Sequence, residues 1–340
     1  MDPYGLRRVV APPGVLPQRA DRLDPTLPLG EDELAIDVEA LNVDAASFRQ
    51  IESAVGRDPA AIAAEVTRLV AAPGKLQNPV TGSGGMLIGR VAEVGPRHPA
   101  AGALEPGHRV ATLVSLTLTP LTPERITAVR PEIDRIECRG RAILFATGLW
   151  ARLPDDLPET LVLAALDVCG APALVLRHLR PGMRVLLLGA GKAGALVAAA
   201  AREQQGGRGW VVAADRSRAA LDDLRRLGAV DDALEVDATD AVGTAEKLRR
   251  AGPPFDLVVN CCSVAGTEMT SLLAVRDGGT VIFFSMATSF TGAALGAEGI
   301  GRDATLVIGN GYVPGHAELT LGLLRRQPRL RALFEQRYAR

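Results

Sequence analysis

The chain is poor in several features that mark particular classes of protein. Only three of its 38 basic residues are lysines, and aromatic residues make up 4% of its 340 residues. The formal net charge of −1 gives no reason to expect nucleic acid or an anionic membrane as a partner. No uninterrupted apolar run approaches the roughly 20 residues that cross a bilayer, and the N-terminus lacks an apolar signal segment. We therefore expect a cytoplasmic protein that binds neither membranes nor nucleic acid.

Metal ligands and disulfide frameworks are also scarce. The four cysteines and four histidines are scattered, with no CxxC pair and no HExxH motif. Scattered thiols in a reducing compartment are most often small buried residues. The sequence therefore does not predict a structural zinc site.

Two regions with different periodicity are present, as expected for a chain of 340 residues. Up to about residue 150, short β-like runs alternate with Pro- and Gly-rich turns, and one helix is expected over 58–74. From about residue 161, strands alternate with helices, beginning with the apolar run 183–190. Five further strands are expected to start at Trp210, Ala233, Asp256, Thr280 and Thr305. This alternation predicts a doubly wound α/β sheet after a β-rich domain.

The run "GAGKAG" supplies Gly189, Gly191 and Gly194 in G-x-G-x-x-G spacing. It follows a buried strand and opens a helix, which is the context expected of a dinucleotide-binding turn. The other members of the predicted cofactor loop are Ala190, Lys192 and Ala193. Lys192 is either a charge near the pyrophosphate or a solvated surface lysine. A plain glycine-rich turn is the alternative for the whole run.

Asp215 ends the next expected strand, twenty-one residues after Gly194. A carboxylate there accepts hydrogen bonds from an adenosine ribose and repels a 2′-phosphate, which favours NAD. Arg216 and Arg218 follow at once and could hold a 2′-phosphate instead, so NADP stays open. Further cofactor contacts are expected at the carboxyl ends of later strands. These candidates are Cys262, Ser263, Ser285 and Met286.

The stretch "NPVTGSGG", residues 78–85, holds three glycines ahead of a strand. Glycine removes the usual restriction on φ, so something is expected to approach this backbone closely. One hypothesis is a wall of backbone N–H groups that receives a carboxylate or the nicotinamide. The alternative is a tight β-turn, in which Thr81 and Ser83 only stabilise the turn.

A β-rich domain followed by this nucleotide fold resembles the medium-chain dehydrogenase/reductase superfamily, which combines a GroES-like catalytic domain with a Rossmann domain. Zinc members place His-Glu and Cys ligands at stations that here read "TGSGGML" and "LNVDAASF", and a third ligand position falls near Ala164. The resemblance therefore implies no catalytic zinc. It also places Asp167 and Val168 near the nicotinamide. We expect a catalytic domain of residues 1–164 and 310–340, including C-terminal helices that pack on it, and a Rossmann domain of residues 165–309.

Longer strings resemble the L-erythro-3,5-diaminohexanoate dehydrogenase family. They are "RVVAPPGVLPQRADRLD", "LNVDAASF", "NPVTGSGGMLIG", "ALDVCGAP", "FFSMATSFTGAALGAEGIGRD" and "IGNGYVPGHAE". Membership would imply NAD-dependent oxidative deamination at C3 in lysine fermentation, giving 5-amino-3-oxohexanoate and ammonia. The expected partner is a small diamino acid, and we expect a homodimer.

This chemistry requires a general base, for which a carboxylate with a raised pKa is suited. Glu298, among small apolar residues, and Asp167 are the leading candidates; Asp44, at the vacant metal station, is a third. His316 is a possible proton carrier, although a capping histidine is the more common case. Each acid can also be a structural hydrogen-bonding residue. Candidate substrate contacts are Thr81, Ser83, Ser289 and Asn310.

Two other functions fit the same pattern. One is a zinc-independent reductase of quinones, enones or β-keto compounds that uses NADPH. The other is a non-catalytic nucleotide-sensing protein. Release of ammonia in proportion to NAD reduction separates the first hypothesis from both.

Overall fold

The computed structural model describes residues 1–285, 287–309 and 311–338. The chain divides into two compact units, Met1–Pro154 and Asp155–Arg340. Each has its own hydrophobic core, one centred on residues such as Ile36 and Leu87 and the other on residues such as Leu186 and Val258. The β-rich first region and the α/β second region are confirmed.

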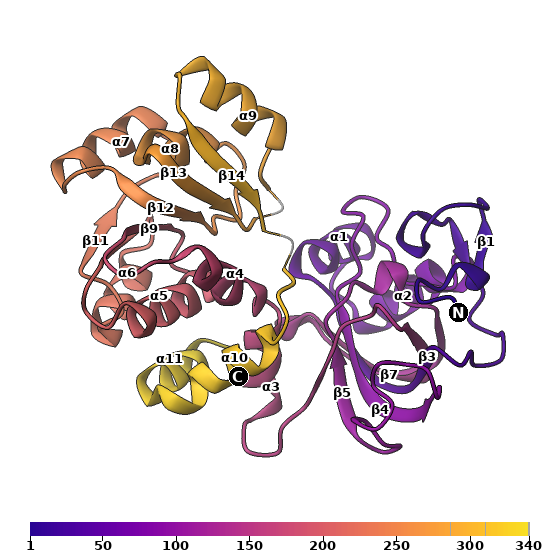
Figure 1. Ribbon diagram of the computed structural model, residues 1–340. Coiled ribbons are helices and arrows are strands. Elements are labelled where there is room, and N and C mark those ends of the chain that lie inside the picture. Colours follow the sequence, from indigo (N-terminus) through magenta and orange to yellow (C-terminus); the bar gives the residue numbers. More distant parts are fainter. Residues whose placement is uncertain (286, 310, 339–340) are drawn as a thin grey trace. The chain divides into compact units, whose positions relative to one another are not determined.

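The first unit is built on an antiparallel sheet with the strand order β6-β7-β3-β4-β5-β8 (Figure 1). Its strands are β1 (Val9–Ala11), β2 (Arg22–Leu23), β3 (Glu33–Asn42), β4 (Met86–Val94), β5 (Arg109–Thr112), β6 (Leu121–Arg130), β7 (Arg135–Phe145) and β8 (Trp150–Arg152). Its α-helices are α1 (Ala45–Val55) and α2 (Pro59–Ala71). The strands expected at Glu33, Met86 and His108 are β3, β4 and β5, and the expected helix is α2.

The first unit also contains elements that the sequence patterns did not predict. Helix α1 begins within "LNVDAASF", and its apolar residues Phe48 and Ile51 are buried in the core. Strand β6 pairs along its length with residues 135–142 of β7, but both strands are partly exposed, so their hydrophobic alternation is weak. The expectation of a single helix in this region is therefore wrong.

The second unit holds a parallel sheet with the strand order β11-β10-β9-β12-β13-β14. Its strands are β9 (Arg184–Leu188), β10 (Trp210–Asp215), β11 (Asp232–Glu235), β12 (Phe255–Asn260), β13 (Val275–Phe283) and β14 (Ala304–Ile308). Its helices are α3 (Glu159–Leu166), α4 (Gly170–His178), α5 (Lys192–Gln205), α6 (Arg218–Leu227), α7 (Ala241–Arg250), α8 (Glu268–Ala274), α9 (Phe290–Gly299), α10 (His316–Arg326) and α11 (Pro328–Tyr338). Helices α4–α6 lie on one face of the sheet and α7–α9 on the other (Figure 1). The strand order reverses between β9 and β12, so the ends of these strands border the crevice of a doubly wound sheet.

The C-terminal helices α10 and α11 belong to the second unit. They contact α3, α4, α5 and α6. The sequence patterns instead predicted that residues 155–164 and 310–340 belong to the first domain. Amphipathic periodicity reveals a buried face but does not identify its partner, which explains the difference.

Within the described ranges, no single helix is long and apolar enough to cross a membrane. Helices α3 and α4, which meet at a bend of 45°, together reach the length and apolar composition of a membrane span.

Candidate functional site

The three glycines between β9 and α5 occupy different environments. Gly189 has a φ of +98°, and a Cβ there would lie 3.0 Å from the carbonyl carbon of Cys261. A Cβ on Gly194 would lie 2.0 Å from the carbonyl oxygen of Gly189, so helix and turn pack in contact. A Cβ on Gly191 would meet no atom of the described residues within 4 Å. The first and third glycines are therefore required by the packing of the turn, whereas the space beside the second glycine is open.

This geometry fits the pyrophosphate of a dinucleotide. The open position at Gly191 lies directly before the first turn of α5, where backbone N–H groups and the helix dipole favour an anion. The remaining loop members, Ala190, Lys192 and Ala193, form the turn and the first residues of that helix. The residues present therefore fit a nicotinamide dinucleotide.

Asp215 is hydrogen-bonded to this turn. Its Oδ2 accepts a hydrogen bond from the Ala190 N–H at 2.6 Å, and its Oδ1 accepts one from the Ser217 N–H at 2.7 Å. A carboxylate oxygen accepts more than one hydrogen bond, so both oxygens keep capacity for ribose hydroxyls. The acid therefore has the position and orientation of a ribose-binding residue.

Lys192 and Asp167 form an ion pair in the second unit. The Lys192 Nζ lies 2.6 Å from the Asp167 Oδ2 and 5.8 Å from the ring centroid of Tyr338. Asp167 is exposed at the C-terminus of α3, and the half-buried Val168 follows it. A carboxylate that holds an ammonium group is a poor general base, so this hypothesis for Asp167 loses support. Lys192 is likewise not a free charge for the pyrophosphate.

The predicted contacts beyond the other strands are near the crevice edge. Cys262 follows β12, and its N–H donates to the Asn260 side chain at 3.0 Å. Burial, together with the charges of Asp215 and Asp237, raises the pKa of the Cys262 thiol to about 12. Ser263 is exposed, and the Ser285 hydroxyl accepts the Ala287 N–H at 3.1 Å. Met286 lies outside the described residues.

Glu298 does not have the environment predicted for it. It lies near the C-terminus of α9 and is exposed to solvent. The small apolar residues around it in sequence do not enclose it, because most of α9 is exposed. The apolar environment expected around Glu298 is therefore absent, and a role as general base stays a prediction.

The remaining candidates of the second unit have structural roles. The Ser289 hydroxyl accepts the Gly292 N–H at 3.0 Å and so caps α9. His316 is the first residue of α10, is 6% exposed, and meets the Tyr312 ring edge-on. Burial lowers the pKa of His316, with Glu318 opposing, so the imidazole is neutral near pH 7. Asn310 lies outside the described residues.

In the first unit, residues 78–83 form a tight turn that satisfies its own backbone. The Asn78 Oδ1 accepts the N–H groups of Val80 and Thr81 at 2.9 and 3.1 Å, and the Asn78 carbonyl accepts that of Gly82. The Ser83 N–H donates to the Thr81 hydroxyl at 3.2 Å. The hypothesis of a wall of free N–H groups is therefore wrong over this turn. A Cβ on the next residue, Gly84, would lie 2.2 Å from the Leu76 carbonyl oxygen, so the close approach is internal.

Asp44 has the most unusual environment of the predicted acids. Its Oδ1 accepts the Ser47 N–H at 2.9 Å and caps α1. Its Oδ2 is buried and accepts no hydrogen bond from the described residues. Ser47 is 1% exposed, and its hydroxyl lies 2.5 Å from that of Thr81. A buried carboxylate oxygen without a hydrogen bond is costly, and this distinguishes Asp44 from Glu298 and Asp167.

Sequence reasoning did not identify Ser47 or Asn78. The usable pattern was Asp44 followed three residues later by Ser47, which is typical of a helix N-terminus. Asn78 could have been found as the first residue of an Asx turn ahead of Pro79.

The side chains at the positions compared with zinc ligands do not fit a catalytic zinc. Asp44, Ser47 and Thr81 offer one carboxylate and two hydroxyls, and neither a thiolate nor an imidazole. Across the described ranges, no group of three or more His, Cys, Asp or Glu residues could hold a metal ion.

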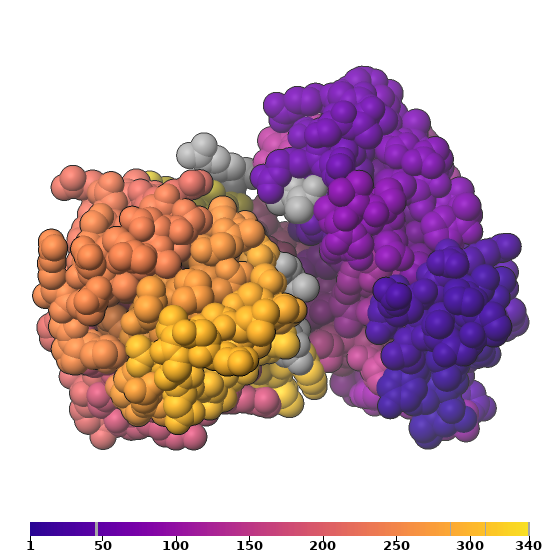
Figure 2. Space-filling view, turned by 90° about the horizontal axis from the view of Figure 1, so that it is seen from above, coloured from indigo at the N-terminus to yellow at the C-terminus, as the bar shows by residue number. Residues whose placement is uncertain are grey.

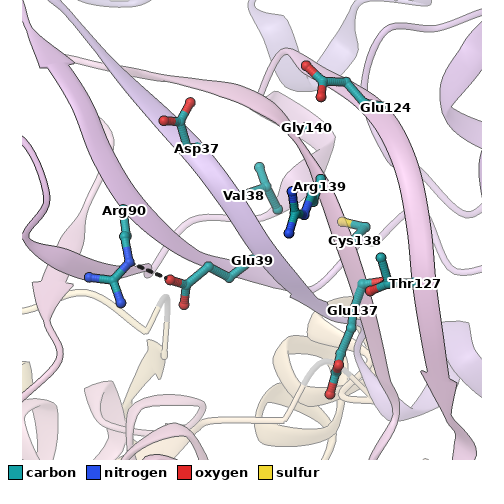
Figure 3. Close-up of a pocket in the computed structure, with 10 residues that line it drawn as sticks. All are labelled: Asp37, Val38, Glu39, Arg90, Glu124, Thr127, Glu137, Cys138, Arg139 and Gly140. Atoms are coloured by element: carbon teal, nitrogen blue, oxygen red, sulfur yellow. Dashed lines mark hydrogen bonds and ion pairs between the residues drawn. The ribbon is translucent and has the colours of Figure 1, made fainter.

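A pocket of about 450 Å³ lies on the first unit, against β3, β4, β6 and β7 (Figure 3). Most of its carboxylates already have arginine partners. Glu39 pairs with Arg90 at 2.8 Å and with Arg109 at 2.6 Å, and Glu137 pairs with Arg130 at 2.7 Å. The charges of these carboxylates are therefore balanced within the protein.

Comparisons with known proteins are consistent along the whole chain. The family model of the L-erythro-3,5-diaminohexanoate dehydrogenase N-terminal domain matches residues 7–154. Among solved structures, a mycobacterial quinone oxidoreductase has a TM-score of 0.57 at 19% identity, covering 95% of this chain and 92% of that one. The alcohol dehydrogenase TADH from Thermus sp. ATN1 has a TM-score of 0.51 at 18% identity, covering 89% and 85%. These structural likenesses show the shared two-domain oxidoreductase fold.

Two curated relatives carry the family assignment. L-erythro-3,5-diaminohexanoate dehydrogenase of Acetoanaerobium sticklandii is 48% identical over 338 residues, 98% of each chain. The protein of the same name from Fusobacterium nucleatum is 45% identical, again over 98% of each chain. The chain therefore belongs to the L-erythro-3,5-diaminohexanoate dehydrogenase family.

Proposed function

We propose that this protein catalyses the NAD-dependent oxidative deamination of L-erythro-3,5-diaminohexanoate. The C3 ammonium form of the substrate, NAD⁺ and water give 5-amino-3-oxohexanoate, NADH, ammonium and one proton. The dehydrogenase names of the two relatives support the substrate, and the fit of the glycine turn supports a nicotinamide cofactor.

When bound, NAD⁺ supplies the acceptor for the hydride that leaves C3. Residues of the second unit would hold it: the open backbone at Gly191 and the first turn of α5 would receive the pyrophosphate. Asp215 would accept hydrogen bonds from the adenosine ribose, and its negative charge would disfavour a 2′-phosphate. NAD is therefore the preferred cofactor in this proposal.

The first unit supplies the proton acceptor. An ammonium group has no lone pair to assist hydride loss, so the C3 nitrogen must lose a proton first. We assign this proton to the Asp44 carboxylate through its unpaired Oδ2. Hydride loss then leaves an iminium, and Asp44 releases the first proton to solvent. The regenerated carboxylate takes a proton from the attacking water and returns it to the nitrogen, and the carbinolamine breaks down to the ketone and ammonium.

The unpaired, buried Oδ2 of Asp44 is the observation that carries this mechanism. Among the three predicted acids, Glu298 is exposed and Asp167 is paired with Lys192, whereas Asp44 is fixed by its own helix cap. The hydroxyl of Ser83, on the turn of residues 78–83, is proposed as a donor to the substrate carboxylate.

The test combines a substrate panel with one variant. Purified protein is assayed for NAD reduction with 3,5-diaminohexanoate, other β-amino acids, alcohols and enones, and ammonia is measured in the same reactions. We expect NADH and ammonia in equal amounts from the diamino acid. Asp44→Asn should lower kcat on the order of 10²-fold or more, because the base is lost. Its melting temperature should be unchanged, because an asparagine still caps α1.

Asp58→Asn is the matched control. Asp58 caps α2 through a 3.0 Å bond to the Ala61 N–H and is exposed, so the same chemical change there should leave kcat unaltered. Turnover of alcohols or enones alone would instead indicate a reductase of the wider superfamily. Dinucleotide binding without any turnover would indicate a nucleotide-sensing protein.

A further inference from the structure

Asp237 is an acid two residues beyond β11, at the same edge of the parallel sheet as Asp215, the proposed ribose-binding residue. Asp215 ends β10, and its Cα partner in the ladder is Glu235, the last residue of β11. The Val236 N–H donates to the Asp215 carbonyl at 3.0 Å, so the pairing continues one residue beyond β11. Asp237 follows at once. It therefore leaves the sheet at the edge where the cofactor turn lies.

The Asp237 carboxylate is oriented by its own turn. Its Oδ1 accepts the Thr239 N–H at 2.9 Å and the Thr239 hydroxyl at 2.7 Å. These two bonds, with a smaller contribution from the Arg216 charge, lower the pKa of Asp237. The group is therefore a fixed negative charge at neutral pH.

Arg216 is the basic residue next to Asp215 at this strand end. It directly follows Asp215, is exposed, and forms no ion pair within 4.0 Å among the described residues. Its charge acts on Asp237, and both Asp215 and Asp237 act on the Cys262 thiol. Arg216 and Asp237 therefore follow neighbouring strand ends, one and two residues beyond the Asp215–Glu235 pair, and carry opposite charges.

An arginine after the second strand of such a fold is suited to a 2′-phosphate, provided that its charge is not already compensated. We propose that Asp237 determines cofactor specificity by compensating the charge of Arg216, which keeps this guanidinium from holding a 2′-phosphate. The inference rests on the proposed use of NAD. It assigns to Asp237 a role separate from that of Asp215, which binds the ribose.

The test measures binding rather than turnover. Full-length protein is titrated with ADP-ribose and with 2′-phospho-ADP-ribose by calorimetry. Asp237→Asn keeps the acceptor for Thr239 and so should fold. We expect it to bind the 2′-phosphate ligand about fivefold more tightly, with ADP-ribose unchanged. The gain should shrink at about 0.5 M salt, because exposed charges are screened.

Three further variants make the test specific. Adding Arg216→Gln to Asp237→Asn should cancel the gain, whereas Arg216→Gln alone should change little. Glu246→Gln, a matched loss of one exposed carboxylate on α7, should change neither affinity. An unchanged ratio of affinities in Asp237→Asn, or a gain that survives in the double variant, overturns the inference while the proposed function stands. Failure of the unmodified protein to bind ADP-ribose overturns both.

Discussion

Single residues decide which parts of the cofactor turn are structural and which receive the ligand. Gly194 and Gly191 belong to the same hexapeptide, yet a Cβ meets a backbone oxygen at 2.0 Å at one and open space at the other. Their substitution should therefore have opposite consequences.

Gly194→Ala should lower the free energy of unfolding by about 1–3 kcal/mol, because the added methyl forces α5 away from the turn. Gly191→Ala should change it by less than about 0.5 kcal/mol but weaken ADP-ribose binding about tenfold, because the methyl enters the ligand's space. Denaturant titration and calorimetry measure the two quantities. Equal loss of stability in both variants would contradict a separate ligand space at Gly191.

Burial and ion pairing distinguish the three predicted acids from one another. Glu298, Asp167 and Asp44 look alike in sequence, since each interrupts a run of small or apolar residues. Only the folded chain exposes the first, pairs the second with Lys192, and leaves one oxygen of the third buried without a partner.

Among the elements, the N-terminal segment is fixed to β3 by a buried ion pair. Arg8 and Glu33 are 0% and 1% exposed, and two N···O distances of 2.7 Å join them. The Gly30 N–H donates to the same carboxylate at 2.6 Å. Figure 2 shows the N-terminal segment (indigo) gathered as one patch on the first unit. The ion pair therefore attaches a segment that has little regular secondary structure.

Glu33→Gln should lower the free energy of unfolding by about 3 kcal/mol at pH 7, because it leaves the Arg8 charge buried without its counter-ion. Burial alone would raise the pKa of Glu33, but the bonds from Arg8 and Gly30 and the charges of Arg8 and Arg7 lower it. The stabilisation is therefore present above the unfolded value of 4.5 and is lost as the pH falls through the lower folded value.

Denaturant titrations of the unmodified protein and of Glu33→Gln, at pH values from about 3 to about 7, would measure this difference in the free energy of unfolding. Asp37→Asn is the control, since Asp37 pairs with Arg141 at 3.2 Å on the surface and should change stability by less than about 0.5 kcal/mol. A Glu33→Gln difference that does not vary with pH would contradict the role of the ionised carboxylate.

At the scale of the whole molecule, the division into units depends on where the C-terminal helices pack. Leu330 and Phe334 of α11 are fully buried, and α11 contacts α3, α5 and α6. Arg337 at its end donates to Asp223 of α6 at 2.8 Å. The last helix is therefore part of the nucleotide-binding unit.

Phe334→Ala should increase amide hydrogen exchange within residues 155–338, because a cavity in that core lowers its stability by about 3–5 kcal/mol. Exchange within residues 1–154 should be unaltered. Mass spectrometry of peptides from the two units reads both effects. Deprotection of the first unit instead would support the grouping of residues 310–340 with the catalytic domain.

The sequence by itself determined the α/β class, the parallel strands and the glycine turn. Continuous apolar strands, 3.6-residue helical periodicity and G-x-G-x-x-G spacing are local properties, so they can be read without a fold. Long shared strings also identified the family. The homodimer and the cytoplasmic location stay predictions.

Only the tertiary structure decided which acid has an unpaired oxygen, which amide groups the turn at residues 78–83 consumes, and where α10 and α11 pack. It also placed the end of β11, two residues before Asp237, next to Asp215, since neighbouring strand ends meet only when the sheet forms. Burial, pairing and strand adjacency depend on contacts between distant segments, and hydrophobic periodicity carries no information about which segments meet.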